Sequence, residues 1–192
     1  PSVSRIAWFD AASIDPETHN GTSIGALANL STAHPDASQS VASSKPTYMQ
    51  TMGPDGGPSL IFDGTGDTLT VDYGSDIVLT DQVSVAGVWN RAVTVRSTLG
   101  ALSDGDPRTN SNSAGYYWFQ YELRQNTDNR VFIWSGNGTS LQNSVSTETD
   151  TTTNYRCDVA TRNDTAFTVL KNGTSLTMST PGTDLAANAR YL

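Results

Sequence analysis

The sequence predicts an all-β protein, a two-sheet antiparallel sandwich, and three observations support this. Of 19 acidic residues 16 are Asp, and only two of 11 basic residues are Lys, a bias toward turn formers rather than helix formers. About ten short apolar or alternating segments are separated by Gly, Pro and Asn turns. The 192 residues contain no long linker and are enough for one domain that buries roughly 70% of its unfolded surface. We therefore expect a single domain over residues 1–192.

The clearest strand signal is Ser59–Tyr73, SLIFDGTGDTLTVDY. An apolar run, Leu60–Phe62, predicts a buried strand that stops at a tight glycine-rich turn. Leu69, Val71 and Tyr73 then alternate with polar residues, which predicts a half-buried strand.

The N-terminal region is mostly irregular by its pattern. Arg5–Asp10 predicts a compact strand, whereas Ala11–Pro58 is polar and rich in turn residues. Within it, Ile24–Leu30 is compatible with a short strand or a helical turn, and Pro46–Met49 with an edge strand.

The central region predicts four strands and then a long connection. Gln82–Trp89 alternates, and two aromatic strands follow later. From Asn137-Gly138 to Tyr155 the chain is rich in Thr and Ser, which predicts a turn-rich connection. The strands are expected at Gln82–Trp89, Val93–Leu102, Tyr116–Leu123 and Arg130–Trp134.

The C-terminal region predicts a meander of Tyr155–Arg162, Ala166–Lys171 and Thr174–Ser179. Asn172-Gly173 is the signature of a two-residue type I′ hairpin turn. The tail, Thr183–Leu192, is equally compatible with a short helix and a closing strand.

The lone Cys157 excludes an internal disulfide. It lies in an alternating run with Tyr155 and Val159. We expect a small buried side chain rather than a reactive thiol.

Charge and hydropathy limit the partners. A net charge of −8 argues against nucleic acid, whose phosphates require a basic surface, and against anionic membrane surfaces. No apolar run approaches the ~20 residues that span a bilayer, so we expect no membrane insertion.

The order of these segments resembles the concanavalin A-like lectin/glucanase superfamily, in its laminin-G-like bacterial and phage branch. The resemblance extends over most of the chain, through short motifs. They are AWFDA at Ala7–Ala11, PTY at Pro46–Tyr48, SLIFDGTGDTLTV at Ser59–Val71, QVSVAGVWNR at Gln82–Arg91 and FTVLKNGTSL at Phe167–Leu176.

This resemblance implies a jelly-roll of two curved sheets that often binds glycans on the concave face or rim loops, and in some members a structural calcium ion. Such domains usually continue beyond the position of Ala187–Leu192 into a final strand beside the first, whereas this sequence ends there.

The residues argue against an enzyme. Retaining glycoside hydrolysis requires two carboxyl groups about 5–5.5 Å apart. The superfamily's glucanases place them in a Glu-x-Asp-x-Glu strand, and this pattern is absent here, where Glu122 stands alone on its strand. The two histidines, His19 and His34, lie in the irregular region without a triad or zinc-ligand pattern around them. We expect no catalytic residues.

Calcium is the one metal with candidate ligands. Asp63, Asp67 and Asp72 cluster around one turn, and carboxylate oxygens from loops suit Ca²⁺. The alternative, which we favour, is that these carboxylates accept hydrogen bonds from the turn's backbone. We expect no required cofactor.

The aromatic strands carry the best candidate binding site. Aromatic rings stack on sugars, and neighbouring polar groups bind their hydroxyls. The alternatives are that this face is the sandwich core, which we favour, or a contact with another subunit. The candidate glycan-binding residues are Tyr116, Trp118, Gln120, Glu122, Arg130, Phe132 and Trp134.

We therefore expect a non-enzymatic jelly-roll module displayed on a phage particle, as a capsid decoration or tail protein, with a glycan-binding or adhesion role. Its partners would be glycans, neighbouring structural proteins, or both, and an oligomer is compatible with this. The N-terminus lacks the apolar segment of a signal peptide, and a Met-Pro start would lose its methionine. The alternatives are a secreted bacterial carbohydrate-binding module and a polysaccharide-cleaving glycoside hydrolase.

Overall fold

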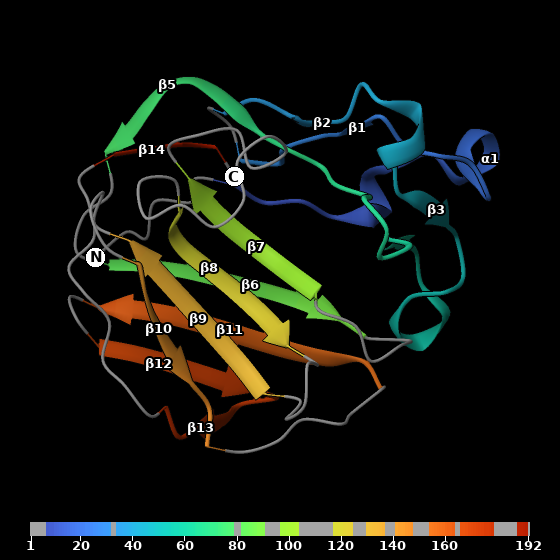
Figure 1. Ribbon diagram of the computed structural model, residues 1–192. Helices are drawn as coiled ribbons and strands as arrows, with labels where there is room; N and C mark the ends of the chain where they lie inside the picture. The colour runs from blue at the N-terminus through green and yellow to red at the C-terminus, as the bar shows by residue number, and fades with distance from the viewer. Residues whose placement is uncertain are drawn as a thin grey trace. The chain divides into compact units, whose positions relative to one another are not determined.

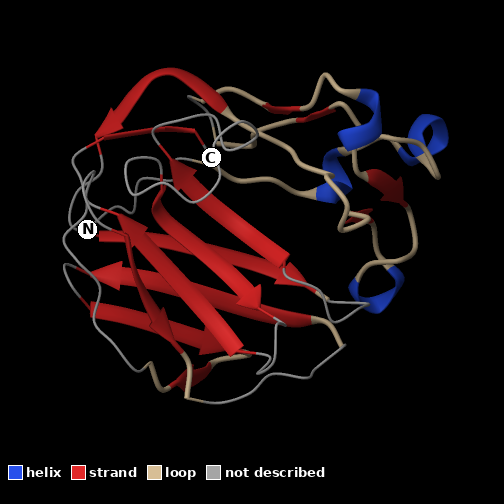
Figure 2. Cartoon of the chain, in the orientation of Figure 1, coloured by secondary structure: helices blue, strands red, loops and turns tan. Residues whose placement is uncertain are grey.

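The protein consists mostly of β-strands, as the computed structural model shows (Figures 1 and 2). The structure describes residues 7–31, 34–78, 82–90, 97–103, 117–124, 130–136, 141–147, 154–163, 166–178 and 188–191. The chain forms two compact units, Pro1–Tyr73 and Gly74–Leu192. The prediction of an all-β protein is confirmed at this level.

The first unit combines short helical turns with short strands. Its helices are η1 (Ala11–Ser13), α1 (Pro16–His19), η2 (Ala42–Ser44) and η3 (Pro54–Gly56). Its strands are β1 (Ala26–Leu27), β2 (Ala37–Ser38), β3 (Thr47–Met49) and β4 (Ser59–Ile61), paired antiparallel as β1–β2 and β3–β4. The side chains of Ile24, Leu27, Ala37, Tyr48 and Val71 are buried in this unit.

Two predictions fail in this unit. Ala7–Asp10, the described part of the predicted strand Arg5–Asp10, has no strand structure. The predicted buried strand at Leu60–Phe62 forms as β4, but Ile61 is 40% and Phe62 50% exposed. Tyr48, the β3 partner of Leu60, is buried, whereas Ile61 on the opposite face of β4 is exposed, so the ribbon covers one face only.

The longer strands form two larger antiparallel sheets. A six-stranded sheet has the order β10-β9-β8-β7-β14-β5, and a four-stranded sheet has the order β13-β12-β11-β6. In the first sheet the bounds are β5 (Asp72–Val78), β7 (Ser97–Ser103), β8 (Tyr117–Arg124), β9 (Arg130–Gly136), β10 (Leu141–Val145) and β14 (Asn188–Tyr191). In the second they are β6 (Gln82–Trp89), β11 (Arg156–Asn163), β12 (Ala166–Lys171) and β13 (Thr174–Leu176).

Several predicted strands are confirmed, and β6 and β12 have the predicted bounds. The tail contains strand β14, so the closing-strand alternative holds rather than the helical one. The connection predicted after Asn137-Gly138 contains strand β10 instead of turns alone, so this part of the prediction is wrong. Asn137-Gly138 itself lies outside the described residues.

The type I′ turn between β12 and β13 is also confirmed. Asn172 and Gly173 have φ angles of +48° and +80°, the left-handed conformation that this turn requires at both central positions. The Asn172 Oδ1 also accepts a hydrogen bond from the Cys157 N–H at 2.8 Å. The turn is thereby fixed to the neighbouring strand β11.

Among the described residues, no helix has the length and apolar character needed to cross a membrane.

Candidate functional site

The aromatic strands β8 and β9 pair in the register that the binding-site hypothesis requires. Gln120 lies directly opposite Trp134, and Glu122 lies opposite Phe132. Paired positions in an antiparallel sheet have Cβ atoms about 4.5–5.5 Å apart. In both pairs, an aromatic residue of β9 therefore has a residue that can form hydrogen bonds as its cross-strand neighbour on β8.

The other candidate glycan-binding residues lie on the same two strands or next to them. Trp118 precedes Gln120 on β8 by two residues, but it is the unpaired residue of a register shift, since Leu102 of β7 pairs with Phe119 and Ser103 pairs with Tyr117. Arg130 pairs with Arg124 at the end of the two strands. Tyr116 lies outside the described residues.

Two buried residues indicate which face of this sheet is covered. Val131 on β9 is fully buried, and Ser146, just after β10, is 1% exposed. Each donates its backbone N–H across the pair: Val131 to the Ser146 Oγ at 3.1 Å, and Ser146 to the Val131 carbonyl at 2.9 Å. Because side chains alternate along a strand, Phe132 and Trp134 belong to the opposite face from Val131.

A further polar position in this row was missed from the sequence. Asn143 on β10 pairs with Trp134 from the side opposite to Gln120. The register therefore places Gln120, Trp134 and Asn143 at neighbouring positions on three adjacent strands. The signal was weak because β10, with the sequence LQNSV, lies in a segment rich in Ser and Thr that predicts turns.

The aspartates after β4 form a hydrogen-bonded turn. The Asp63 carboxylate accepts hydrogen bonds from the Thr65 N–H at 2.7 Å and the Thr65 hydroxyl at 2.6 Å, and Asp67 accepts one from the Asp63 N–H at 2.9 Å. The Thr65 hydroxyl and N–H hold the pKa of Asp63 below its ordinary value of 3.8. In the described part of the chain, no three His, Cys, Asp or Glu side chains come together as a metal site.

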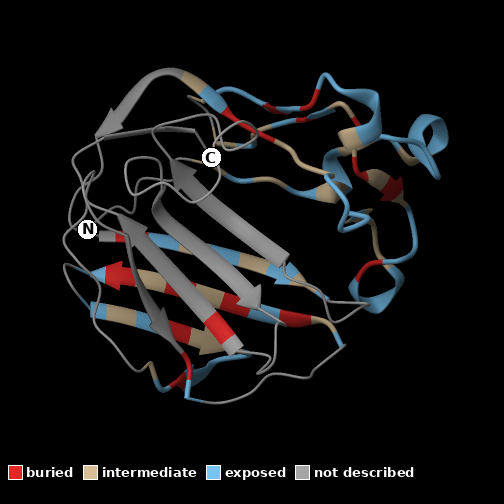
Figure 3. Cartoon of the chain, in the orientation of Figure 1, coloured by how far each residue is buried: buried red, intermediate tan, exposed pale blue. Residues whose placement is uncertain are grey.

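The central strand of the four-stranded sheet, β11, buries charged residues. Arg156, Asp158 and Arg162 are 3%, 0% and 0% exposed, and Ala160 between them is also buried (Figure 3). The Arg156 Nε donates to the Asp158 Oδ2 at 2.6 Å, and its Nη2 contacts the same oxygen. From β6, the Trp89 Nε1 donates to this oxygen at 3.3 Å. A buried carboxylate thus accepts from a guanidinium and an indole, as a buried charge requires.

Gly87 makes room for this arrangement. It pairs with Asp158 across the strands, and a Cβ on Gly87 would lie 2.4 Å from Cζ3 of Trp89. The indole therefore lies over the glycine, where any larger residue would displace it. Further along, the Arg162 guanidinium lies over the Phe167 ring, 5.4 Å from its centroid, a cation–π contact.

The prediction that Cys157 is buried is wrong. Cys157 is exposed, because the residues of β11 that point inward are Arg156, Asp158, Ala160 and Arg162. The predicted alternation is present in β11, but the side chains predicted to be buried are on the opposite face. The buried set contains three charged residues, which sequence patterning assigns to the solvent side.

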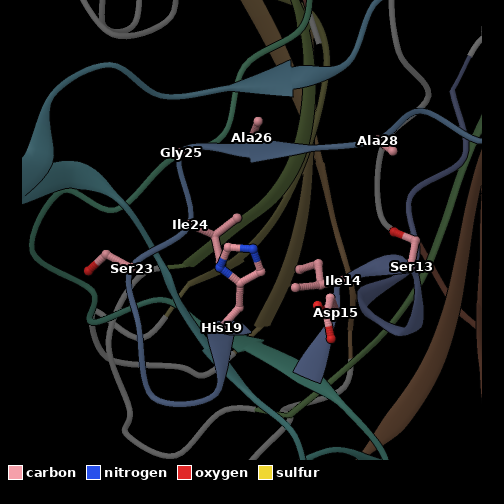
Figure 4. A pocket seen from close by; sticks show the side chains of 9 residues that line it. All are labelled: Ser13, Ile14, Asp15, His19, Ser23, Ile24, Gly25, Ala26 and Ala28. Carbon is pink, nitrogen blue, oxygen red and sulfur yellow. The ribbon is translucent and has the colours of Figure 1, made fainter. Parts of the chain in front are cut away.

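The first unit contains a pocket of about 310 Å³ between α1 and β1 (Figure 4). The figure shows the His19 imidazole near Ile24 and the Ile14–Asp15 segment. The Asp15 carboxylate caps α1: Oδ1 accepts from the Glu17 N–H at 3.0 Å, and Oδ2 from the Thr18 hydroxyl at 3.1 Å. The Asp15 carboxylate therefore has a structural role as the cap of α1.

The second histidine has a structural contact. The rings of His34 and Tyr73 meet edge to face, with centroids 5.4 Å apart. Burial raises the pKa of the half-buried Tyr73 to about 12.

No protein-family model, no curated protein and no solved structure matches this chain.

Proposed function

We propose that this chain is a non-enzymatic module of jelly-roll architecture that binds glycans through the face of β8, β9 and β10 carrying Trp134 and Phe132. What carries the proposal is the complete burial of Val131. Phe132 and Trp134 alternate with Val131 along β9 and therefore belong to the opposite face of the sheet from the buried one.

The chemistry of these positions suits a sugar. The flat indole of Trp134 offers a stacking surface for the C–H face of a pyranose ring. Its two cross-strand neighbours, Gln120 and Asn143, are amides that both donate and accept hydrogen bonds. Neutral, bidirectional partners fit hydroxyl groups, whereas a phosphate ligand would require cations.

An enzymatic role has less support. Glu122 pairs with Phe132 on one side and Thr98 on the other, so its immediate cross-strand neighbours provide no second carboxylate. Of the two histidines, His34 packs edge to face against Tyr73. The proposed module therefore holds a ligand without transforming it.

We further propose that the module is displayed on the surface of a phage particle, where adhesion to cell-surface glycans would be its task. The support is the resemblance in segment order, together with the strand-rich architecture. A secreted carbohydrate-binding module is the alternative, and identifying the proteins that co-purify with the chain distinguishes the two.

A glycan array tests the binding proposal. Wild-type protein should bind a restricted set of glycans, Trp134→Ala should lose that binding, and Trp8→Ala should keep it. Trp8 is a matched control because it is a 47% exposed tryptophan in the first unit. Absence of any bound glycan, with a stable contact to a capsid or tail protein, would leave a structural role alone.

Two further assays test the remaining expectations. Release of reducing ends from a bound polysaccharide, abolished by Glu122→Gln, would overturn the non-enzymatic proposal. Calcium at Asp63, Asp67 and Asp72 would raise the melting temperature, and chelation with EDTA would reverse this rise. We expect no change with EDTA, because Asp63 and Asp67 already accept hydrogen bonds within their turn.

A further inference from the structure

At the described strand positions, the solvent-facing side of the four-stranded sheet is unusual in carrying no charged residue. We call this side, formed by the residues of β6, β11 and β12 that alternate with the buried ones, the outer face. Its other described positions are Ser, Thr, Asn or Gln. Its apolar positions are Ala86, Val88, Cys157, Val159, Ala166 and Leu170.

The distribution of charge across this sheet is the reverse of the usual one. A sheet with one solvated face normally places charged residues outward and apolar residues inward. Here Arg156, Asp158 and Arg162 point to the buried side, whereas the outer face exposes Val88 by 58% and Cys157 as a free thiol. The rest of the surface must carry most of the 30 charged residues of the chain.

We propose that the outer face is the contact surface between two copies of this chain, which pack sheet against sheet about a two-fold axis. This inference is independent of glycan binding. Each copy has a net charge of −8, so two copies repel each other wherever charged surfaces approach. A two-fold contact brings the same patch of both copies together. At the outer face this would bring no like charges close to each other.

The side chains also suit close approach. Small residues such as Ala86, Cys157 and Ala166 leave the sheet flat, and stacked sheets pack about 10 Å apart. A hydrogen bond between the Ser84 and Thr161 hydroxyls, 2.9 Å apart, satisfies polar groups within the sheet and leaves fewer to be desolvated at the contact.

The size of the face sets the strength of the contact. Strands about 4.8 Å apart that rise about 3.3 Å per residue give a patch of about 500 Å² on each copy. Two copies would bury about 1,000 Å² in total, at the lower limit for a specific interface. We therefore expect a dimer with a dissociation constant in roughly the micromolar range.

Salt distinguishes this contact from one held by opposite charges. Because screening weakens the repulsion between copies of like charge, added NaCl should strengthen the dimer. A dimer held by ion pairs would weaken instead.

Sedimentation velocity of the full chain, from about 1 to about 200 µM, tests the proposal. Wild type should pass from monomer to dimer. Val88→Glu should raise the dissociation constant at least tenfold, whereas Val41→Glu should leave it unchanged. The two substitutions are matched, since Val41 in the first unit is a 54% exposed valine. A monomer throughout, or equal dissociation constants for the two variants, would overturn the proposal.

Cys157 provides a second readout that requires no substitution. A maleimide should label its thiol more slowly when the protein is dimeric, because the partner covers it. Ala86→Glu should restore fast labelling at high concentration. A labelling rate that is independent of wild-type concentration would contradict the proposal even if Val88→Glu failed to fold.

Discussion

The indole Nε1 of Trp89 donates a hydrogen bond to the Asp158 Oδ2, 3.3 Å away on the neighbouring strand. The same oxygen accepts from Arg156, so three side chains of the four-stranded sheet meet at one carboxylate oxygen. Since Asp158 is fully buried, its charge depends on these donors for the solvation that water would otherwise provide.

Asp158→Asn should therefore destabilise the protein strongly. The substitution preserves the shape but removes the negative charge facing the buried Arg156 guanidinium, and breaking a buried pair costs about 3–5 kcal/mol. Urea unfolding measures the loss. Asp55→Asn, at an exposed aspartate of the first unit, is the matched control and should change stability by less than about 0.5 kcal/mol. A loss below about 1 kcal/mol for Asp158→Asn would contradict the importance of the pair.

Gly87→Ala should destabilise the protein through the tryptophan. The new Cβ would lie 2.4 Å from Trp89 Cζ3, so the indole must move and its hydrogen bond to Asp158 weaken. We expect a loss of about 1–3 kcal/mol. In a double-mutant cycle with Trp89→Ala the loss should largely disappear, because the clashing ring is gone. An equal cost in both backgrounds would show that the indole is not the cause.

Gly173→Ala isolates the cost of backbone conformation in the turn between β12 and β13. Gly173 has a φ angle of +80°, and a Cβ there would meet nothing within 4 Å. The expected loss, about 1–2 kcal/mol by urea unfolding, comes from placing an L-residue in the left-handed region. An unchanged stability would mean that the turn has another conformation in solution.

The Asp63 turn should contribute stability that depends on pH. Its pKa in the folded protein is lowered, so the contribution is complete above 3.8 and is lost as pH falls through the folded value. Thr65→Val, which lacks the hydroxyl, should raise the pKa of Asp63 toward 3.8 in an NMR titration. Thr65→Ser, which keeps the hydroxyl, should preserve the low value. A wild-type pKa at or above 3.8 would contradict the hydrogen bonds described.

Strand positions were largely predictable from the sequence, because alternation and turn residues are local signals. The Asn172-Gly173 turn and the strands β6 and β12 followed directly from them. Strand β10 escaped prediction because its polar sequence resembles a loop, and its place is set by pairing with β9.

Which face of a strand is buried was less predictable. In β11 the alternation of Tyr155, Cys157 and Val159 against Arg156 and Asp158 predicts the first set inside, whereas the structure buries the second. The buried side holds the Arg156–Asp158 ion pair, and Trp89, 69 positions before Asp158, donates a hydrogen bond to it. No local pattern contains that information.

The candidate glycan site was partly accessible to the sequence. The aromatic and polar residue types of β8 and β9 indicated a binding face, but their pairing, and the position of Asn143 beside Trp134, come from sheet register. Register depends on contacts between segments and therefore could not be read from either strand alone.

The most direct test of glycan binding is a calorimetric titration with a glycan selected on the array, done beside an unfolding measurement on the same samples. We predict that Trp134→Ala raises the dissociation constant at least tenfold. The free energy of unfolding, measured with urea, should stay within about 0.5 kcal/mol of the wild-type value. A dissociation constant that does not change would contradict binding at this face. A loss of several kcal/mol in stability on Trp134→Ala would assign Trp134 to the core instead.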